Sequence, residues 1–170
     1  AYDSKIFATQ YYNEAQDEDY LEYGEDEVKL NEYDQEKIDK IDAQYKDKLK
    51  VWFDFETYKQ IIEDKEICIP YIVCFLVLIG GKLKWGYAKG KNCGRLMLDC
   101  IAGLSKDQEE VLFIAHNCGF DYNFIVKYLY SIKQIKKGSS LMNARAKYKS
   151  YKHKKTINIE VKDSWRLIPM

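Results

Sequence analysis

One stretch decides how the chain is interpreted: Val51-Trp52-Phe53-Asp54-Phe55-Glu56-Thr57. Its apolar side chains alternate with others in the pattern of a β-strand, and residues two apart in a strand point to the same side. Asp54 and Glu56 therefore share one face, where two carboxylates repel each other unless a cation lies between them. The competing interpretation is an edge strand whose acids simply face water.

The next segments predict two further strands. Residues 71–79 are a continuous apolar run of strand type. Gly80-Gly81 then supplies a two-residue turn, after which Leu83, Trp85 and Tyr87 alternate with other residues. We therefore expect three consecutive antiparallel strands.

Helical and strand patterns follow in turn. Leu96, Cys100 and Leu104 recur at helical spacing, and residues 111–115 form another apolar strand. A second helix is expected over about 121–132. A hairpin of segments 141–148 and 156–162 is expected next, around the basic linker 149–155. Antiparallel strands 1-2-3, a crossover helix and a parallel strand are the order of the ribonuclease-H-like fold. The predicted class is thus α/β, a mixed sheet with helices on its faces.

Charge is distributed unevenly. Acidic and basic residues number 27 each, yet residues 1–50 hold 15 of the acids and 7 of the bases. No acid lies between Asp121 and Glu160, a segment rich in lysine. A polyanion is the expected partner of this basic part, although a solvated loop with scattered lysines has the same composition. The lysines expected to contact phosphates are Lys136, Lys137 and Lys147.

We divide the chain at residue 50. Residues 1–49 are an acidic leader or linker, in which residues 32–49 could form a charged helix. Residues 50–170 are long enough for one domain. The sequence starts at Ala1 and stops in Pro169-Met170, so we expect a fragment of a longer protein.

The cysteines and the apolar runs indicate a compartment. Five cysteines are an odd number, and they lack C-x-x-C spacing. Most lie in apolar runs, as reduced core cysteines do, which predicts an intracellular location. The longest apolar run, residues 67–79, is shorter than the ~20 residues of a membrane-spanning helix. No membrane partner is expected.

A third carboxylate follows the strand 111–115. The segment His116-Asn117-Cys118-Gly119-Phe120-Asp121 begins where a strand ends, and open sheets place ligand sites there. In a sheet of the predicted order Asp121 can face Asp54. Three carboxylates without a thiolate suit Mg²⁺ or Mn²⁺. Two such ions would activate a water and stabilise the leaving oxygen of a phosphodiester.

These residues resemble a known family, the 3′–5′ exonuclease domain of family B DNA polymerases. The resemblance is greatest to the protein-primed branch of phages, adenoviruses and linear plasmids. The segment 54–57 is similar to its first motif and 116–121 to its second. Residues 162–169 are similar to a segment that holds single-stranded DNA, although Trp165 stands where that segment has Leu. The resemblance covers about residues 50–170.

The resemblance implies a fragment of a DNA-directed DNA polymerase, a nucleotidyltransferase that carries a proofreading nuclease. Its cofactors would be two Mg²⁺ or Mn²⁺ ions. Its partners would be the single-stranded 3′ end of primer-template DNA and a priming terminal protein. A mitochondrial linear plasmid or a viral replication site would be its location.

The resemblance also implies residue roles. Asp54, Glu56 and Asp121 would be the catalytic metal ligands. Contacts with the primer end or the priming protein are implied for Thr57, His116, Asn117, Phe120, Phe124 and Ser164. A base can stack on an aromatic ring such as that of Phe120. For Phe124, on the apolar stripe of the expected helix, core packing is the more natural interpretation.

One part of the family pattern is missing. Its third motif, Y-x-x-x-D, supplies a fourth carboxylate and a tyrosine, and no such pattern follows Asp121. We therefore expect the domain to be truncated before this motif, and to bind single strands but degrade them poorly.

Three alternatives stay open. One is a stand-alone ribonuclease-H-like nuclease, and another is a catalytically inactive module that binds nucleic acid or a priming protein. A third reads His116 and Asp121 as the H-x-x-x-x-D of a related exonuclease class, with Asp99 as its second acid in the middle of a helix.

Overall fold

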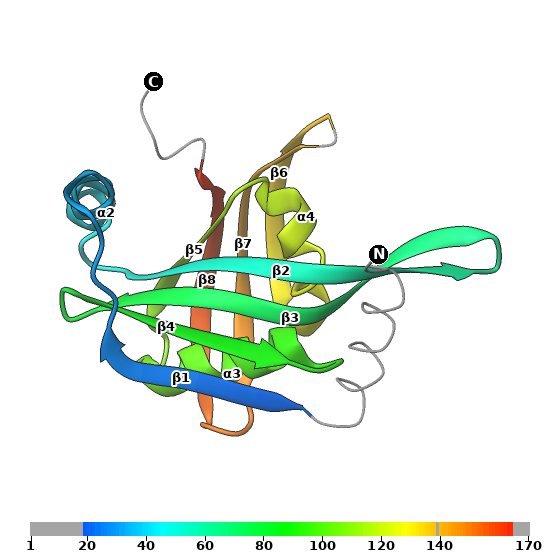
Figure 1. The fold of residues 1–170 in the computed structure, drawn as a ribbon, viewed down its shortest axis with the longest axis horizontal. Helices are drawn as coiled ribbons and strands as arrows, with labels where there is room; N and C mark the ends of the chain where they lie inside the picture. The colour runs from blue at the N-terminus through cyan, green and yellow to red at the C-terminus, as the bar shows by residue number, and fades with distance from the viewer. Residues whose placement is uncertain (1–18, 139, 165–170) are drawn as a thin grey trace, which may run out of the picture.

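The alternating stretch 51–57 lies in β2 (Leu49–Ile62), an inner strand of an eight-stranded sheet (Figure 1). The computed structural model describes residues 19–138 and 140–164. The other strands are β1 (Tyr20–Glu27), β3 (Lys65–Ile79), β4 (Lys82–Lys89), β5 (Glu110–Ala115), β6 (Tyr130–Lys137), β7 (Ser140–Ser150) and β8 (Lys155–Asp163). Their order across the sheet is β1-β4-β3-β2-β5-β8-β7-β6, and β5 runs parallel to both of its neighbours.

Several predicted strand pairings are confirmed. β2, β3 and β4 are consecutive and antiparallel, and β5 lies parallel to β2. The β3–β4 turn uses Gly80 and Gly81, whose φ angles of +58° and +75° are the left-handed values that favour glycine. β7 and β8 form the predicted hairpin. Sequence alternation and glycine placement were sufficient to find these strands.

The predicted fold class, an α/β ribonuclease-H-like domain with helices on its faces, is wrong. The described part of the chain is mostly β, with 54% of its residues in strands. Its described residues form three α-helices: α2 (Glu32–Gln44), α3 (Cys93–Leu104) and the short α4 (Cys118–Tyr122). β1 and β6, which were not predicted, form the two edges of the sheet, and β2 and β3 extend beyond the predicted stretches 51–57 and 71–79.

Two segments fold differently from expectation. Residues 20–27, assigned above to the acidic leader, form β1 and pair with β4. The helix expected over 121–132 is replaced by α4, a 3₁₀ turn (Val126–Tyr128) and β6. Ile132 thus lies in a strand. We attribute this to the pairing of β6 with β7, a tertiary contact that outweighs local helical spacing.

The expected charged helix is present in part. α2 begins at Glu32, where the Asn31 side chain accepts a hydrogen bond from the Asp34 N–H, a standard cap. The helix was expected to continue to residue 49, but it ends at Gln44, and Leu49 is the first residue of β2. No helix in residues 19–138 and 140–164 is long and apolar enough to cross a membrane.

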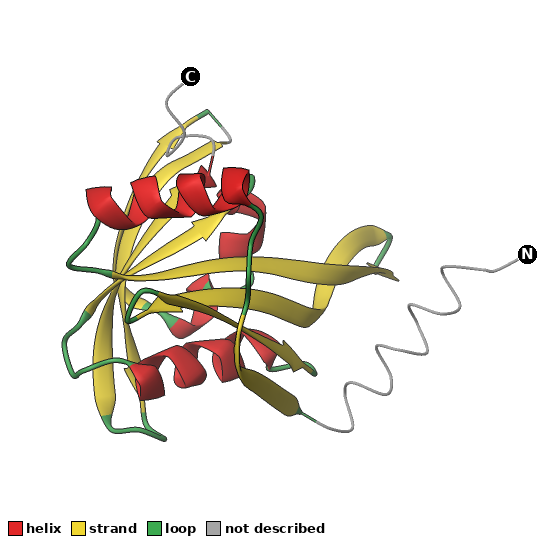
Figure 2. Ribbon diagram, turned by 60° about the vertical axis from the view of Figure 1, so that its left-hand side comes forward, coloured by secondary structure: helices red, strands yellow, loops and turns green. Residues whose placement is uncertain are grey.

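The sheet has an inner face, which bears the main core, and an outer face. Val51, Phe53 and Phe55 point into the inner core, which includes buried residues of α3. On the outer face a smaller cluster joins Ile41 of α2 to Leu112 and Ile114 of β5. Ile41 is the one buried residue of α2, so this helix covers little of the sheet (Figure 2).

Candidate functional site

Asp54 and Glu56 lie on the outer face of β2. Phe53 and Phe55 are buried on the inner face, so the alternation predicted from sequence separates carboxylates from core. Both acids are exposed. A register shift between Glu56 and Thr57 marks an irregularity in the pairing with β3 at this point, where Thr57 lies opposite Pro70. Such irregularities redirect side chains beside functional sites.

Asp121 is brought to β2 by α4. Its side chain is 3% exposed, and its Oδ1 accepts a hydrogen bond of 2.9 Å from the Phe55 N–H. β5 pairs with β2 only as far as Trp52. Beyond that point the Asp121 carboxylate, instead of a backbone carbonyl of β5, accepts the hydrogen bond from the β2 backbone. The third acid therefore reaches the backbone between Asp54 and Glu56.

The three carboxylates influence one another. Burial, together with the negative charges of Asp54 and Glu56, raises the pKa of Asp121 to about 6, although the hydrogen bond from Phe55 acts in the opposite direction. Within residues 19–138 and 140–164, however, no three His, Cys, Asp or Glu side chains form a compact group that could hold a metal ion. The donor chemistry is that of a Mg²⁺ or Mn²⁺ site, and the spacing is looser than such a site requires.

The position of α4 is fixed at both of its sides. Asn117, which precedes the helix, has a left-handed φ of 53°, a conformation that asparagine tolerates well. The Cys118 N–H donates a 3.0 Å hydrogen bond to Oδ2 of Asp163, at the end of β8. Gly119 faces Leu141 of β7. The ends of β5, β8 and β7 thus together locate Asp121.

The two phenylalanines of the second motif differ in exposure. Phe124 packs on Phe55 with ring centroids 5.3 Å apart, in agreement with the core role favoured above. Phe120 is 41% exposed and meets Phe124 edge to face at 5.0 Å. Part of the Phe120 ring is therefore open to a ligand, whereas Phe124 packs between Phe120 and Phe55.

His116 and Ser164 line one cavity with Asp54. This cavity has a volume of about 880 Å³ and lies on the outer face of β2, β3 and β4. The motif segment 165–169 lies outside the described residues. The structure therefore brings three of the predicted residues together. The cavity is also lined by residues that were not predicted to belong to a site: Trp52, Cys74, Leu76, Trp85 and Tyr87.

The basic residues divide into two groups. Lys136 and Lys137 end β6 and are exposed. Lys136 pairs with Leu141, the neighbour of Gly119, so this tip lies at the same end of the sheet as α4. Lys147 lies elsewhere, in a second cavity of about 500 Å³ that Lys133 and Arg145 also line. The three lysines do not form one patch.

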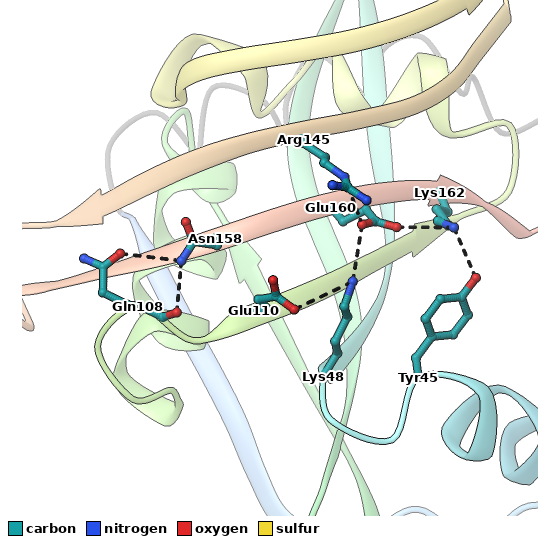
Figure 3. A network of polar contacts seen from close by, with 8 residues as sticks. All are labelled: Tyr45, Lys48, Gln108, Glu110, Arg145, Asn158, Glu160 and Lys162. Atoms are coloured by element: carbon teal, nitrogen blue, oxygen red, sulfur yellow. Dashed lines mark hydrogen bonds and ion pairs between the residues drawn. The ribbon is translucent and has the colours of Figure 1, made fainter.

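An ionic network lies on the outer face beside this second cavity (Figure 3). The buried carboxylate of Glu160 contacts Lys48, Arg145 and Lys162 at 3.2–3.3 Å. Burial opposes its ionisation, but hydrogen bonds and charges from Lys162 and Lys48 lower the pKa of Glu160 below its ordinary value. Lys162 also donates to the Tyr45 hydroxyl at 3.1 Å. The network joins β7, β8 and the segment between α2 and β2.

Asp99, the second acid of the alternative exonuclease pattern, lies in the middle of α3. Its Oδ1 accepts hydrogen bonds from the Tyr148 hydroxyl at 2.5 Å and from the Ser150 hydroxyl at 2.8 Å. Tyr148 belongs to the inner core, whereas Asp54 and Glu56 lie on the outer face. The observed partners give Asp99 the role of tying α3 to β7.

Comparison with known proteins identifies no relative of this chain. No family model, no curated protein and no solved structure matches the chain.

Proposed function

We propose that this chain carries the carboxylate centre of a 3′–5′ exonuclease that acts on single-stranded DNA, within a DNA polymerase of the protein-primed family B type. One observation carries the proposal: the Asp121 carboxylate is anchored on the Phe55 N–H between Asp54 and Glu56. This hydrogen bond places the Asp121 carboxylate against the strand that bears the other two acids, Asp54 and Glu56.

The residues around this centre have the chemistry to hold a single strand. Lys136 and Lys137 at the β6–β7 tip would contact phosphates, and Phe120 would stack on a base. His116 and Ser164 supply polar groups beside Asp54. The strand would pass from the basic tip over α4 to the carboxylates.

Asp54, Glu56 and Asp121 would hold the divalent cation in this proposal. When bound, the cation would lower the pKa of a water and neutralise charge on the phosphate. The protein itself positions one ligand firmly, because the hydrogen bond from Phe55 fixes Asp121. The two others, on the exposed side of β2, are free to adjust.

An assay with 5′-labelled single-stranded DNA and Mg²⁺ tests the activity. We expect slow shortening from the 3′ end, since the sequence lacks the Y-x-x-x-D pattern after Asp121. The shortening should disappear in Asp54→Asn and persist in the matched control Asp39→Asn, on exposed α2. Binding of the strand without any shortening would indicate the inactive binding module instead.

A further inference from the structure

The outer face of β2, β3 and β4 carries three transverse rows of side chains, because directly paired residues share a face. From β2 to β4 the rows are Trp52, Leu76 and Trp85; Asp54, Cys74 and Tyr87; and Glu56, Ile72 and Lys89. The first two rows line the cavity of about 880 Å³. We call its apolar part, Trp52, Cys74, Leu76, Trp85 and Tyr87, the aromatic groove.

The groove has two ends of different chemistry. Asp54, His116 and Ser164 form its polar end, next to the candidate site, and the rings of Trp85 and Tyr87 form the other. Its volume falls within the ~300–1,000 Å³ that is usual for ligand pockets. An apolar floor with a few polar groups at one end is the usual composition of such pockets.

The two rings of β4 are fixed before any ligand arrives. The Trp85 and Tyr87 planes are parallel to within 5°, with centroids 6.0 Å apart. A Cβ on Gly24 of β1 would lie 3.0 Å from Nε1 of Trp85, so the indole lies close against that strand. The Tyr87 hydroxyl donates to Glu22 at 3.0 Å. Because their orientation is already set, a flat ligand would lose little free energy in ordering them.

The charges select the kind of flat ligand. Asp54 and Glu56 would repel a phosphate placed in the groove unless a cation lies between them, whereas a carboxylate accepts hydrogen bonds from the exocyclic amino group of a base. A lipid chain would leave Asp54, His116 and Ser164 against hydrocarbon, which is unfavourable. The base of a nucleotide fits these conditions when its phosphate stays outside.

We infer that the aromatic groove binds an unpaired nucleobase of a single strand, and that it favours the bases with an exocyclic amino group, cytosine, adenine and guanine, over thymine. This inference rests on the proposed function, since the groove opens beside Asp54. It adds a specific site for the base, on the strands of the sheet rather than on α4.

Oligonucleotide affinity tests the inference. Stacking on one aromatic residue accounts for about a 5-fold or larger change in affinity. We therefore expect Trp85→Ala and Tyr87→Leu each to bind a single-stranded oligo-dC at least ~5-fold more weakly. Tyr33→Leu is the matched control, because it removes an exposed tyrosine ring on α2, outside the groove. Wild type should bind oligo-dC more tightly than oligo-dT.

Cys74 gives a second test that needs no change in the groove. It is exposed and lies between Asp54 and Tyr87 in the middle row. Oligo-dC should slow the labelling of Cys74 by a maleimide severalfold, while Cys68 on the β2–β3 hairpin keeps its rate. Peptide mapping by mass spectrometry distinguishes the two thiols.

The outcomes separate the two proposals. Failure of the wild type to bind any single strand would refute the proposed function and this inference together. Binding that is unchanged in Trp85→Ala and Tyr87→Leu, with Cys74 labelled at its free rate, would refute the inference alone. Cys74 could instead become protected as the protein concentration rises, without any oligonucleotide. That result would assign the groove to a second copy of the chain and would also refute the inference.

Discussion

Glu160→Gln should destabilise the fold, because it removes a negative charge that is buried among three cations on the outer face. The Glu160 side chain is 9% exposed, and its two oxygens contact Lys48, Arg145 and Lys162. Glutamine preserves the shape of the side chain but not its charge. The substitution therefore isolates the electrostatic contribution of the network.

The expected loss of stability in Glu160→Gln can be estimated from the exposure of each cation that Glu160 contacts. Arg145 is 71% exposed, so its contact should contribute ~0–1 kcal/mol. Lys48 and Lys162 are largely buried, and hydrogen bonds to charged groups are worth ~1.5–3 kcal/mol each. Water reaches both amines once the charge is removed, which reduces the sum. We expect a decrease of about 2–3 kcal/mol in the free energy of unfolding.

Urea denaturation followed by tryptophan fluorescence measures this decrease. The matched control is Glu110→Gln, which alters an exposed partner of the same Lys48 at 3.9 Å and should cost less than ~0.5 kcal/mol. The reasoning would be refuted if Glu160→Gln also stayed within ~0.5 kcal/mol of the wild type.

The remaining predictions concern pH, the inner face and the basic tip. Folding lowers the pKa of Glu160, so the ionised carboxylate stabilises the fold at pH values above its ordinary pKa of ~4.3. This stabilisation is lost as the pH falls through the folded pKa. The free energies of unfolding of wild type and Glu160→Gln, plotted against pH, should therefore converge in acid. Tyr148→Phe removes one of the two hydroxyls that Asp99 binds, and should lower the free energy of unfolding by about 1–2 kcal/mol. Tyr151→Phe, on an exposed turn, should leave it unchanged. Changing Lys136 and Lys137 to Gln should make the log–log salt dependence of strand affinity shallower by ~0.7 for each phosphate that the variant no longer neutralises; an unchanged slope would show that they only face solvent.

The inner strands were predictable from sequence because they are apolar and regular. β3 and β5 are continuous apolar runs, and β2 alternates between buried phenylalanine and exposed acid. The edge strands were not predictable in this way. β1 is rich in Glu and Tyr and resembles a linker, and every residue of β6 is exposed. An edge strand needs little burial, so its pattern carries little signal.

The candidate site was predictable to a similar extent. The order of the motifs indicated that Asp121 would approach β2, but its hydrogen bond to Phe55 depends on where β5 stops pairing. Alternation indicated that Trp85 and Tyr87 share a face. That this face opens into a cavity beside Asp54 depends on α2 packing farther along the sheet, over β5. Such long-range placement has no local signal in the sequence.

The most direct test of the central claim is a Mn²⁺ titration followed by electron paramagnetic resonance, which reports free Mn²⁺. A shared carboxylate centre predicts that the wild-type chain binds Mn²⁺ and that Asp54→Asn and Asp121→Asn each bind it severalfold more weakly, since each removes a charged oxygen ligand. Asparagine at position 121 can still accept the hydrogen bond from the Phe55 N–H, so the fold should persist. Asp39→Asn should match the wild type. Equal Mn²⁺ affinity in the wild type and in both site variants would contradict such a centre.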